Sequence, residues 1–576
     1  MPQVAKGLIC WGVDSFTRGV NTRSSRLLVA AGIGALTLAS LWPVFHAGLW
    51  VSDEELHWPR RLSEFAFAIG EGQWWPRWFP NLEWGHGYPY PNFYAPAALW
   101  LGWLGFLATH SYLWGIKLAF LVAGVLAPWG MYRFLRPGIS RPAALIGAML
   151  YHLAPYHTLN VLVRGNLAEY LAMGLFPWVL WGLSRLGRRH RAKDIILAAS
   201  LLAAYQLSHN LSALFGTATL VGWIFLSHLW GGLRWKVTAW RIGAIVAACA
   251  LGTIYWLPAL WDIQFVRVGQ VMEQIVAADH VIYPLQLLDP RWGWGYSVPG
   301  HGDEISLQMG LPQAVALLLG LCVFIRSREH RKALAPWLIL CLVLLLVVLP
   351  WSAPLWKLPV LRLIQFPWRL LAWIAVATAI VGAQSFDSLP AGRSKAVGFF
   401  VMLFILTQLI YSRAEFFRPY QPEHFEPGFT RQYLRSNTTA GEYLPRWIVE
   451  PPQVPSRWEL GLSGPGSVAA VPGSSDFFDQ RWEVELAEPQ LVRWDVYRFP
   501  NWQVEIDGLP AQVISAPEGV VVFQASAGRH EVRIQWVATP IHVTAQLVSL
   551  ATLFGLAGWA LIEIRRRAGS RPKRRP

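Results

Sequence analysis

The stretch SDEELHWPRR, residues 52–61, places three acids, a histidine and two arginines directly after a long apolar run. Carboxylates and an imidazole can accept protons, and a carboxylate that is partly desolvated near a membrane boundary has a raised pKa. A structural explanation competes with this chemistry, because Ser52 and Glu55 have the spacing of a helix capping box. Pro59 weakens that explanation, since proline is costly deep in a helix and suits the first helical position. We therefore expect the acids in a loop that precedes a surface helix.

Polar residues also interrupt the ends of later apolar runs. They are Arg164 and Glu169 in VRGNLAEY, His209 and Asn210 in LSHNLSAL, and Arg369 in QFPWRLL. The planar guanidinium group of arginine binds phosphate through two parallel hydrogen bonds, so these residues are candidates for an anion site. An ion pair between helices is the alternative for Arg164 and Glu169, and helix capping is the alternative for Asn210. Both alternatives stay open from the sequence.

The segment 72–100, GQWWPRWFPNLEWGHGYPYPNFYAPAALW, is dominated by aromatic residues and prolines. A belt of aromatic residues is common at a membrane interface, but a belt does not need the charged and polar residues that are interleaved here. Aromatic faces with nearby polar groups suit sugar rings, through stacking and hydrogen bonds. We therefore expect Arg77, His86, Tyr88 and Tyr94 to contact a substrate.

These residues stand beside a series of apolar runs in a chain of 576 residues, of which 54% are hydrophobic and 14% are charged. Runs of roughly 18 or more apolar residues are the signature of membrane-spanning helices. The sequence therefore predicts a mainly α-helical polytopic membrane protein with about twelve spans. We place them near 27–48, 112–134, 142–157, 168–186, 193–208, 211–231, 240–261, 308–326, 334–351, 366–386, 395–412 and 541–564. The run 95–109 is short for a crossing and is predicted to be an interfacial or half-buried helix.

The basic residues predict the orientation of these spans. The formal net charge is +15, and the arginines and lysines cluster beside span ends. Because basic loops stay in the cytoplasm, the segment 1–26 and the basic tail 565–576 are both predicted to be cytoplasmic. The charge therefore indicates membrane topology and not a nucleic-acid partner. Three of the four cysteines lie in apolar runs, so neither a disulfide framework nor a zinc site is indicated.

Residues 413–540 have few apolar runs and alternate between apolar and polar positions as strands do. The alternating stretches are RWEVELAE (481–488), QLVRWDVYRF (490–499), WQVEIDG (502–508), GVVVFQA (519–525) and HEVRIQWV (530–537). We predict an extracytoplasmic β-sandwich of the immunoglobulin-like size class here. It is inserted between a transmembrane domain at 27–412, with its first outer loop at 49–111, and a last span at 541–564.

Several stretches resemble the GT-C class of membrane glycosyltransferases. Four features in this order resemble the class: an acidic first outer loop after the first span, a surface helix, the Pro-rich stretch GYPYPNFYAP and a short embedded helix. More narrowly, the chain resembles bacterial multi-pass proteins labelled 6-pyruvoyl-tetrahydropterin synthase-related, and the YfhO-like proteins. That likeness lies in GQWWPRWFPNLEWGHGYPYPNFYAP, VRGNLAEYLAMGLFPWVL, LSHNLSAL, QFPWRLL, TAGEYLPRW and YRFPNWQVEIDG. These stretches extend from the first loop to the outer domain.

The resemblance implies a sugar donor carried on a polyprenyl phosphate, with a carboxylate of the first outer loop acting as base or metal ligand. Asp53 matches that position, and Glu55 and His57 are the further catalytic candidates. If the enzyme depends on a metal, these three residues would hold Mg²⁺ or Mn²⁺. The donor phosphate needs cations, and we expect Arg164 and Arg369 to supply them in preference to Arg60 and Arg61. The expected substrate-binding residues are Arg60, Arg61, Arg77, His86, Tyr88, Tyr94, Arg164, Glu169, His209, Asn210 and Arg369.

The predicted function is therefore transfer of a sugar from a polyprenyl-phosphate donor to an envelope glycan, lipid or protein acceptor. It would occur on the outer face of a bacterial-type plasma membrane. Two other functions stay open: a transporter or flippase, and a glycan-binding scaffold of envelope polysaccharide assembly. The low number of charged residues within the apolar runs argues against ion-coupled transport.

Overall fold

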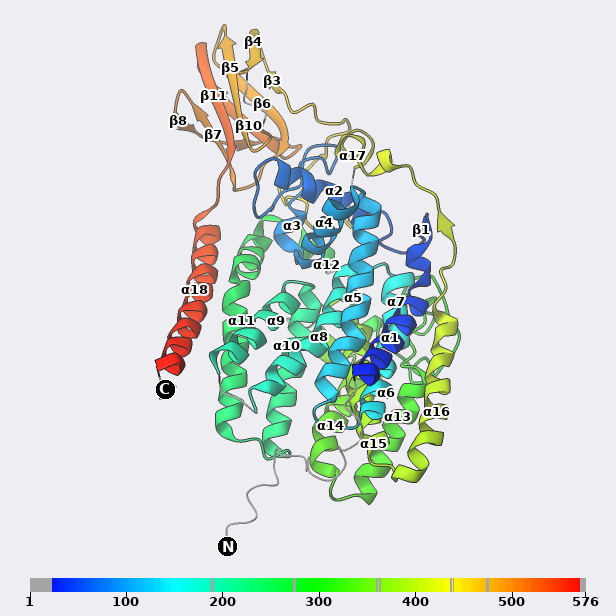
Figure 1. Cartoon of the computed structure of the whole chain (residues 1–576). Coiled ribbons are helices and arrows are strands. Elements are labelled where there is room, and N and C mark those ends of the chain that lie inside the picture. Colours follow the sequence, from blue (N-terminus) through cyan, green and yellow to red (C-terminus); the bar gives the residue numbers. More distant parts are fainter. Residues whose placement is uncertain are drawn as a thin grey trace.

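The computed structural model describes residues 23–187, 191–272, 276–358, 361, 364–435, 438, 440–472 and 476–569. A bundle of helices carries a β domain at one end (Figure 1). Most of the predicted N-terminal segment and the end of the basic tail lie outside the described residues.

Within the described residues, seven helices are long and apolar enough to cross a membrane. They are α5 (Tyr112–Leu135), α8 (Leu167–Arg185), α10 (Asn210–Leu229), α11 (Trp235–Asp262), α14 (Arg331–Val348), α15 (Leu371–Asp387) and α18 (Pro540–Gly569). The other predicted spans overlap helices outside this group: α1 (Arg23–Ser40), α6 (Arg141–His152), α7 (Pro155–Leu162), α9 (Ala192–Gln206), α13 (Leu311–Arg326) and α16 (Ala391–Leu406). These helices support a multi-pass membrane protein, whereas the number twelve stays a prediction.

The predicted span 142–157 is two helices in the structure. α6 ends at His152, and α7 begins at Pro155. Proline has no backbone N–H and clashes with the preceding turn, so it begins a helix more readily than it continues one. The break turns α7 into a short separate helix, and the loop that follows it returns to the start of α8.

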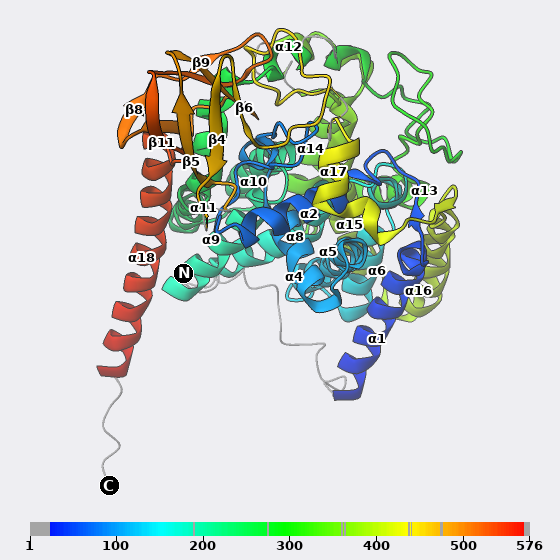
Figure 2. The ribbon, with the colours of Figure 1, turned by 90° about the horizontal axis from the view of Figure 1, so that it is seen from above.

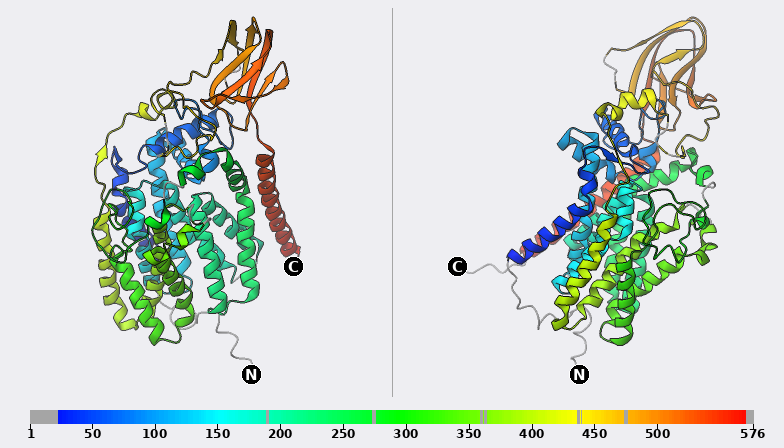
Figure 3. Two further views of the ribbon diagram at one scale, coloured as in Figure 1. Left: turned by 180° about the vertical axis from the view of Figure 1, so that it is seen from behind. Right: turned by 90° about the vertical axis from the view of Figure 1, so that its right-hand side faces the viewer.

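α8 and α15 lie inside the bundle, and most of their residues are buried. α18 is different, since most of its apolar residues are exposed and it stands beside α11 at the edge of the bundle (Figures 1 and 3). A helix that is apolar on all sides and packs on protein along one side only needs a lipid environment for its other sides. The central helices are therefore the ones that can hold polar groups away from lipid.

The first outer loop folds into three short helices: α2 (His57–Gly70), α3 (Tyr90–Phe93) and α4 (Ala97–Thr109). They lie at the end of the bundle that carries the β domain (Figure 1). Pro59 is the third residue of α2, within the first turn, where the backbone N–H of any residue lacks a helical partner. α4 packs closely on α5, because a Cβ on Gly105 would lie 2.8 Å from the carbonyl oxygen of Gly115.

The β domain is a pair of antiparallel sheets. One sheet has the order β3-β6-β10-β9 and the other the order β4-β5-β11-β7-β8. The strands are β3 (Leu460–Leu462), β4 (Gly466–Ala470), β5 (Asp479–Leu486), β6 (Gln490–Tyr497), β7 (Trp502–Ile506), β8 (Leu509–Ala511), β9 (Ile514–Ser515), β10 (Val520–Ala525) and β11 (Gly528–Trp536). All five predicted stretches are strands. Alternate residues of β5 are buried, as the alternating pattern indicates.

The strands of the sandwich begin only at Leu460, so residues 413–459 do not belong to it. That segment forms β2 (Phe417–Arg418), which pairs with β1 (Leu49–Trp50), and the helix α17 (Pro427–Tyr433). Seen from above, α17 and α2 lie over the bundle, while the sandwich lies toward α11 and α18 (Figure 2). The segment therefore runs across the end of the bundle that carries the β domain before it enters the sandwich.

Candidate active site

The acidic loop after the first span is fastened to the loop between α7 and α8. The backbone N–H of Asp53 donates to the carbonyl of Val163 (3.0 Å), and that of Glu54 donates to the carbonyl of Arg164 (3.1 Å). Gly165 has a φ of +62° and faces Ser52 so closely that a Cβ would collide with the serine side chain. Two stretches that the sequence analysis selected separately, Asp53 and Arg164, thus meet at one place.

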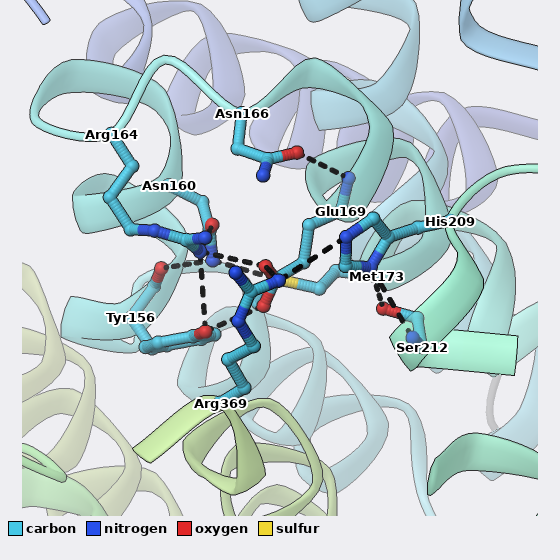
Figure 4. Close-up of polar contacts among 9 residues, drawn as sticks. All are labelled: Tyr156, Asn160, Arg164, Asn166, Glu169, Met173, His209, Ser212 and Arg369. Carbon is cyan, nitrogen blue, oxygen red and sulfur yellow. Dashed lines mark hydrogen bonds and ion pairs between the residues drawn. The ribbon is translucent and has the colours of Figure 1, made fainter. Parts of the chain in front are cut away.

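Arg164 of this junction belongs to a buried polar cluster (Figure 4). Its centre is Glu169, in the first turn of α8, and the backbone N–H of Glu169 is capped by the Asn166 side chain (2.9 Å). Arg164 Nη1 lies 2.7 Å and Arg369 Nη1 lies 3.4 Å from Glu169 Oε2, while Tyr156 Oη donates to Oε1 at 2.5 Å. We call Tyr156, Asn160, Arg164, Glu169, His209 and Arg369 the Glu169 cluster.

His209 connects Arg369 to the start of α10. Arg369 Nη1 lies 3.3 Å from His209 Nε2, and His209 Nδ1 lies 2.9 Å from Ser212 Oγ. Burial lowers the pKa of His209 to about 3, and the nearby Arg369 lowers it further while Glu169 opposes the shift. The imidazole is therefore neutral, and because arginine can only donate, Nε2 is the acceptor. The N-cap of α10 is His209 and not Asn210.

The Glu169 cluster has an excess of positive charge. Two guanidinium groups share one carboxylate, and the neutral His209 adds no charge. Arg369 Nε has no hydrogen-bond partner among the described residues, although the side chain is buried. A buried N–H without an acceptor is costly, so this cluster is suited to receive an anion.

The three acids of the loop have different partners. Glu54 pairs with Arg61 (2.8 Å), whose guanidinium lies 4.4 Å from the ring of Tyr90. Glu55 accepts from Arg418 (3.0 Å), from Tyr420 and, through its other oxygen, from the backbone N–H of Ser52. This last contact is half of the capping box that the spacing of Ser52 and Glu55 predicts.

Asp53 is the acid whose carboxylate stays available. Its side chain is exposed and forms no hydrogen bond or ion pair within 4 Å to another described residue. Desolvation by the surrounding protein raises the pKa of Asp53 from 3.8 to about 6, while Arg164 lowers it and Glu54 raises it. A carboxylate with that pKa is mostly ionised at neutral pH and can take up a proton readily.

Other predicted site residues lie near this cluster without belonging to it. The Tyr94 ring lies 6.2 Å from that of His209 and 4.9 Å from that of Tyr90. Arg60 follows on α2, and its Nε has no partner among the described residues. His57 begins α2 and donates its backbone N–H to the carbonyl of Glu54.

The aromatic loop is held by contacts within the protein, and its expected contact with a substrate stays a prediction. Arg77 donates to Asn92 (2.8 Å) and to the carbonyl of Ile254. Both ring nitrogens of His86 contact backbone carbonyls, of Asp495 and Val454, and Tyr88 Oη bonds to Thr438. Their side chains are buried, so the loop binds the outer segment and the β domain.

The Asn210 side chain also bonds to other parts of the protein. Its side chain donates to the carbonyl of Phe93 (2.8 Å) and accepts from Tyr255 Oη (2.6 Å). These contacts join α10, α11 and α3, so Asn210 positions helices beside the Glu169 cluster. Its direct contact with a substrate stays a prediction.

The predicted metal ligands Asp53, Glu55 and His57 do not form a recognisable metal group in the structure. Among the described residues, no group of three or more histidine, cysteine, aspartate or glutamate side chains could hold a metal ion. Both oxygens of Glu55 are engaged with other partners and would have to leave them to bind a metal ion. A role for Mg²⁺ or Mn²⁺ stays a prediction.

Sequence reasoning missed Tyr156, Asn160 and Trp368. Tyr156, Asn160 and Arg164 follow one another at intervals of four residues, which is the spacing of one helix face and a signal that could have found the first two. Trp368 immediately precedes Arg369, and its ring lies 4.8 Å from the guanidinium carbon of Arg164. The sequence has 34 tryptophans, so nothing in the composition singles out this one.

Comparison with known proteins gives one sequence match. Residues 93–256 match the family described as dolichyl-phosphate-mannose-protein mannosyltransferase, which is less than half of the chain. This region contains Tyr156, Arg164, Glu169 and His209. No curated protein sequence matches the chain.

Solved structures of three glycosyltransferases share a weak likeness of fold. The arabinofuranosyltransferase AftD from Mycobacteria is 18% identical, with a TM-score of 0.43 over 68% of this chain and 26% of that chain. An oligosaccharyltransferase from Archaeoglobus fulgidus is 13% identical, with a TM-score of 0.45 over 75% of this chain and 61% of that chain. ArnT from Cupriavidus metallidurans, bound to undecaprenyl phosphate, is 15% identical, with a TM-score of 0.40 over 71% of this chain and 68% of that chain.

The chain thus spans about a quarter of the length of AftD, and TM-scores below 0.5 carry no further conclusion. The narrower resemblance to the 6-pyruvoyl-tetrahydropterin synthase-related and YfhO-like proteins stays a prediction. The family match over residues 93–256 agrees with the resemblance to the GT-C class and with the predicted class of function, a membrane glycosyltransferase.

Proposed function

We propose that the protein transfers a sugar from a polyprenyl-phosphate donor to a hydroxyl group of an envelope glycan, lipid or protein acceptor. The observation that carries the proposal is the meeting of Asp53 with the Glu169 cluster. An available carboxylate lies beside a buried group with excess positive charge, where two loops are joined by backbone hydrogen bonds. A base and an anion site at one place are what this transfer requires.

Each residue has a defined part in the proposed reaction. The acceptor oxygen forms a bond to the anomeric carbon of the sugar and gives its proton to the Asp53 carboxylate. The bond between the anomeric carbon and the phosphate oxygen breaks at the same time, and its electron pair leaves with the polyprenyl phosphate. Arg164 and Arg369 stabilise the charge that develops on the phosphate, since a guanidinium group can offer it two N–H donors.

Glu169 and Tyr156 hold the two arginines in place. Without the carboxylate, two guanidinium groups would repel each other in a buried position. A phosphate would share them with Glu169, and it would also satisfy Arg369 Nε. Arg61 is neutralised by its ion pair with Glu54 and lies against the Tyr90 ring, so the excess charge at the site comes from Arg164 and Arg369.

The orientation of the helix bundle in the membrane is also part of the proposal. The helices of the first loop, α2, α3 and α4, lie with the β domain at one end of the bundle (Figure 1), which we assign to the outer face of a bacterial-type plasma membrane. The basic segments at both termini are then cytoplasmic, as basic flanks of membrane spans usually are. The domain bounds 1–26, 27–412, 413–540, 541–564 and 565–576 are part of this proposal.

The test compares the acids of the loop in protein reconstituted into nanodiscs. A panel of synthetic polyprenyl-phosphate sugars is supplied with an envelope lipid and glycan extract, and release of free polyprenyl phosphate is measured by mass spectrometry. Asp53→Asn keeps the shape of the side chain and removes the base, so turnover should fall about 10²- to 10⁴-fold with little change in melting temperature.

Glu54→Gln is the matched control, because it lies next in sequence and keeps a hydrogen bond to Arg61. Its turnover at pH 7.5 should stay within about threefold of wild type. Similar, mild losses for Asp53→Asn, Glu54→Gln and Glu55→Gln, together with a larger loss of stability for Ser52→Ala, would indicate helix capping and contradict the proposal.

A further inference from the structure

Trp368 lies between the two arginines of the Glu169 cluster and an outer loop. Its ring is 4.8 Å from the guanidinium carbon of Arg164 and 5.8 Å from that of Arg369. The Trp368 side chain is buried, and its ring and that of Tyr156 lie edge to face with centroids 6.2 Å apart. One indole thus contacts both cations that the proposed donor phosphate would meet.

The rotation of this indole is set by a residue from another part of the chain. Trp368 Nε1 donates to Ser297 Oγ at 3.1 Å. Ser297 belongs to the outer loop between α12 (Val268–Met272) and α13, and its hydroxyl also lies 3.0 Å from His280 Nδ1. Phe366 also connects Trp368 to this loop. Its ring stacks on Trp368 and lies edge-on to that of His280, with ring centroids 4.9 Å apart.

An indole against the face of a guanidinium group has a specific effect. It stabilises the cation and restricts the rotation of the arginine side chain, while the N–H groups at the guanidinium edge stay free to donate. The Trp368 ring lies near two arginines that repel each other, so its orientation affects the separation and direction of both. A rotation of the indole would therefore change the geometry offered to an anion.

We propose that Trp368 is a positioning residue for donor binding and that Ser297 holds it in the productive orientation. The outer loop around Ser297 thereby controls how tightly the site binds a polyprenyl phosphate. This inference rests on the proposed function, since it assigns the phosphate of the donor to Arg164 and Arg369. Trp368 acts through the arginines and takes no part in bond making or breaking.

The test measures binding of undecaprenyl phosphate to the full-length protein in nanodiscs by native mass spectrometry. Trp368→Phe keeps an aromatic ring but removes the N–H donor, and Ser297→Ala removes its acceptor. Each variant should weaken binding about three- to tenfold, which is the usual effect of one lost hydrogen bond. The double variant should bind about as weakly as Trp368→Phe alone, because both changes remove the same contact.

The pair Trp356 and Ser352 is a matched control. Trp356 Nε1 donates to Ser352 Oγ at 3.0 Å, and to the carbonyl of Val347 at 3.1 Å, in another buried outer turn, and no arginine lies over the Trp356 ring among the described residues. Trp356→Phe and Ser352→Ala should leave the affinity for undecaprenyl phosphate unchanged. Ser297→Thr, which restores a hydroxyl group, should recover most of the affinity that Ser297→Ala loses.

Kinetics give a second measurement. The KM for the donor should rise in Trp368→Phe and Ser297→Ala, while kcat at saturating donor should stay within about twofold of wild type. Unchanged binding in folded Ser297→Ala, or additive losses in the double variant, would overturn the inference even if Asp53→Asn is inactive. If the wild type itself binds no undecaprenyl phosphate, the proposed function fails together with this inference.

Discussion

Turnover should depend on the protonation state of Asp53. Desolvation by the surrounding protein raises the pKa of this carboxyl group to about 6, so the basic form is lost as the pH falls through that value. With a pKa near 6, about nine-tenths of the groups are ionised at pH 7 and about one-tenth at pH 5, so kcat/KM should fall roughly tenfold between these values. The donor phosphodiester keeps its single negative charge over this range and adds no step of its own.

The assay follows release of polyprenyl phosphate in nanodiscs between pH 4.5 and 8.5, with the melting temperature recorded at each pH. Glu54 raises the pKa of Asp53 by like-charge repulsion, so Glu54→Gln should move the midpoint to lower pH. The residual activity of Asp53→Asn should no longer fall between pH 7 and pH 5. A flat profile between pH 5 and 8, or an equal step in Asp53→Asn, would refute the assignment of Asp53 as the base.

Three further predictions follow from the packing around the site. Glu169→Gln leaves two buried guanidinium groups without their countercharge and should lower the free energy of unfolding by about 3–5 kcal/mol, measured as a fall in melting temperature. Gly165→Ala should separate the two loops, because it adds a Cβ at a position where φ is +62° and the Ser52 side chain is in contact. Limited proteolysis should then cut the acidic loop faster than in the wild type. An unchanged rate of proteolysis would contradict the close packing. In a cysteine-free background, a cysteine at Gly508 should react with an impermeant thiol reagent in intact cells and one at Arg328 should not. Equal labelling of the two would refute the orientation.

The membrane architecture could be predicted because its main determinant is local. A run of apolar residues long enough to cross a bilayer is visible in the sequence, and helices occupy every predicted span. The prediction erred at 142–157, where hydrophobicity alone cannot show that Pro155 starts a new helix. The five alternating stretches of the β domain could also be predicted from local sequence. A strand with one buried face has apolar residues at alternate positions.

The contacts of the aromatic loop could not be predicted from local sequence. Its composition suits either sugar stacking or protein packing, and both use the same aromatic faces and hydrogen-bonding groups. In the structure, the side chains of His86 and Tyr88 bond within the protein, to Thr438, Val454 and Asp495 far along the chain. No local pattern records a partner that is more than three hundred residues away.

The sequence by itself determined which residue types were present at the ends of the spans, and it selected Asp53, Arg164, Glu169, His209 and Arg369 as candidates. Only the tertiary structure decided that Arg164, Glu169, His209 and Arg369 form one cluster and that Asp53 joins it through the contact between two loops. It also decided which acid stays available, because the partners of Glu54 and Glu55 lie on α2 and on the strand β2. Charge and type belong to each residue alone, whereas pairing and desolvation depend on neighbours that folding brings together.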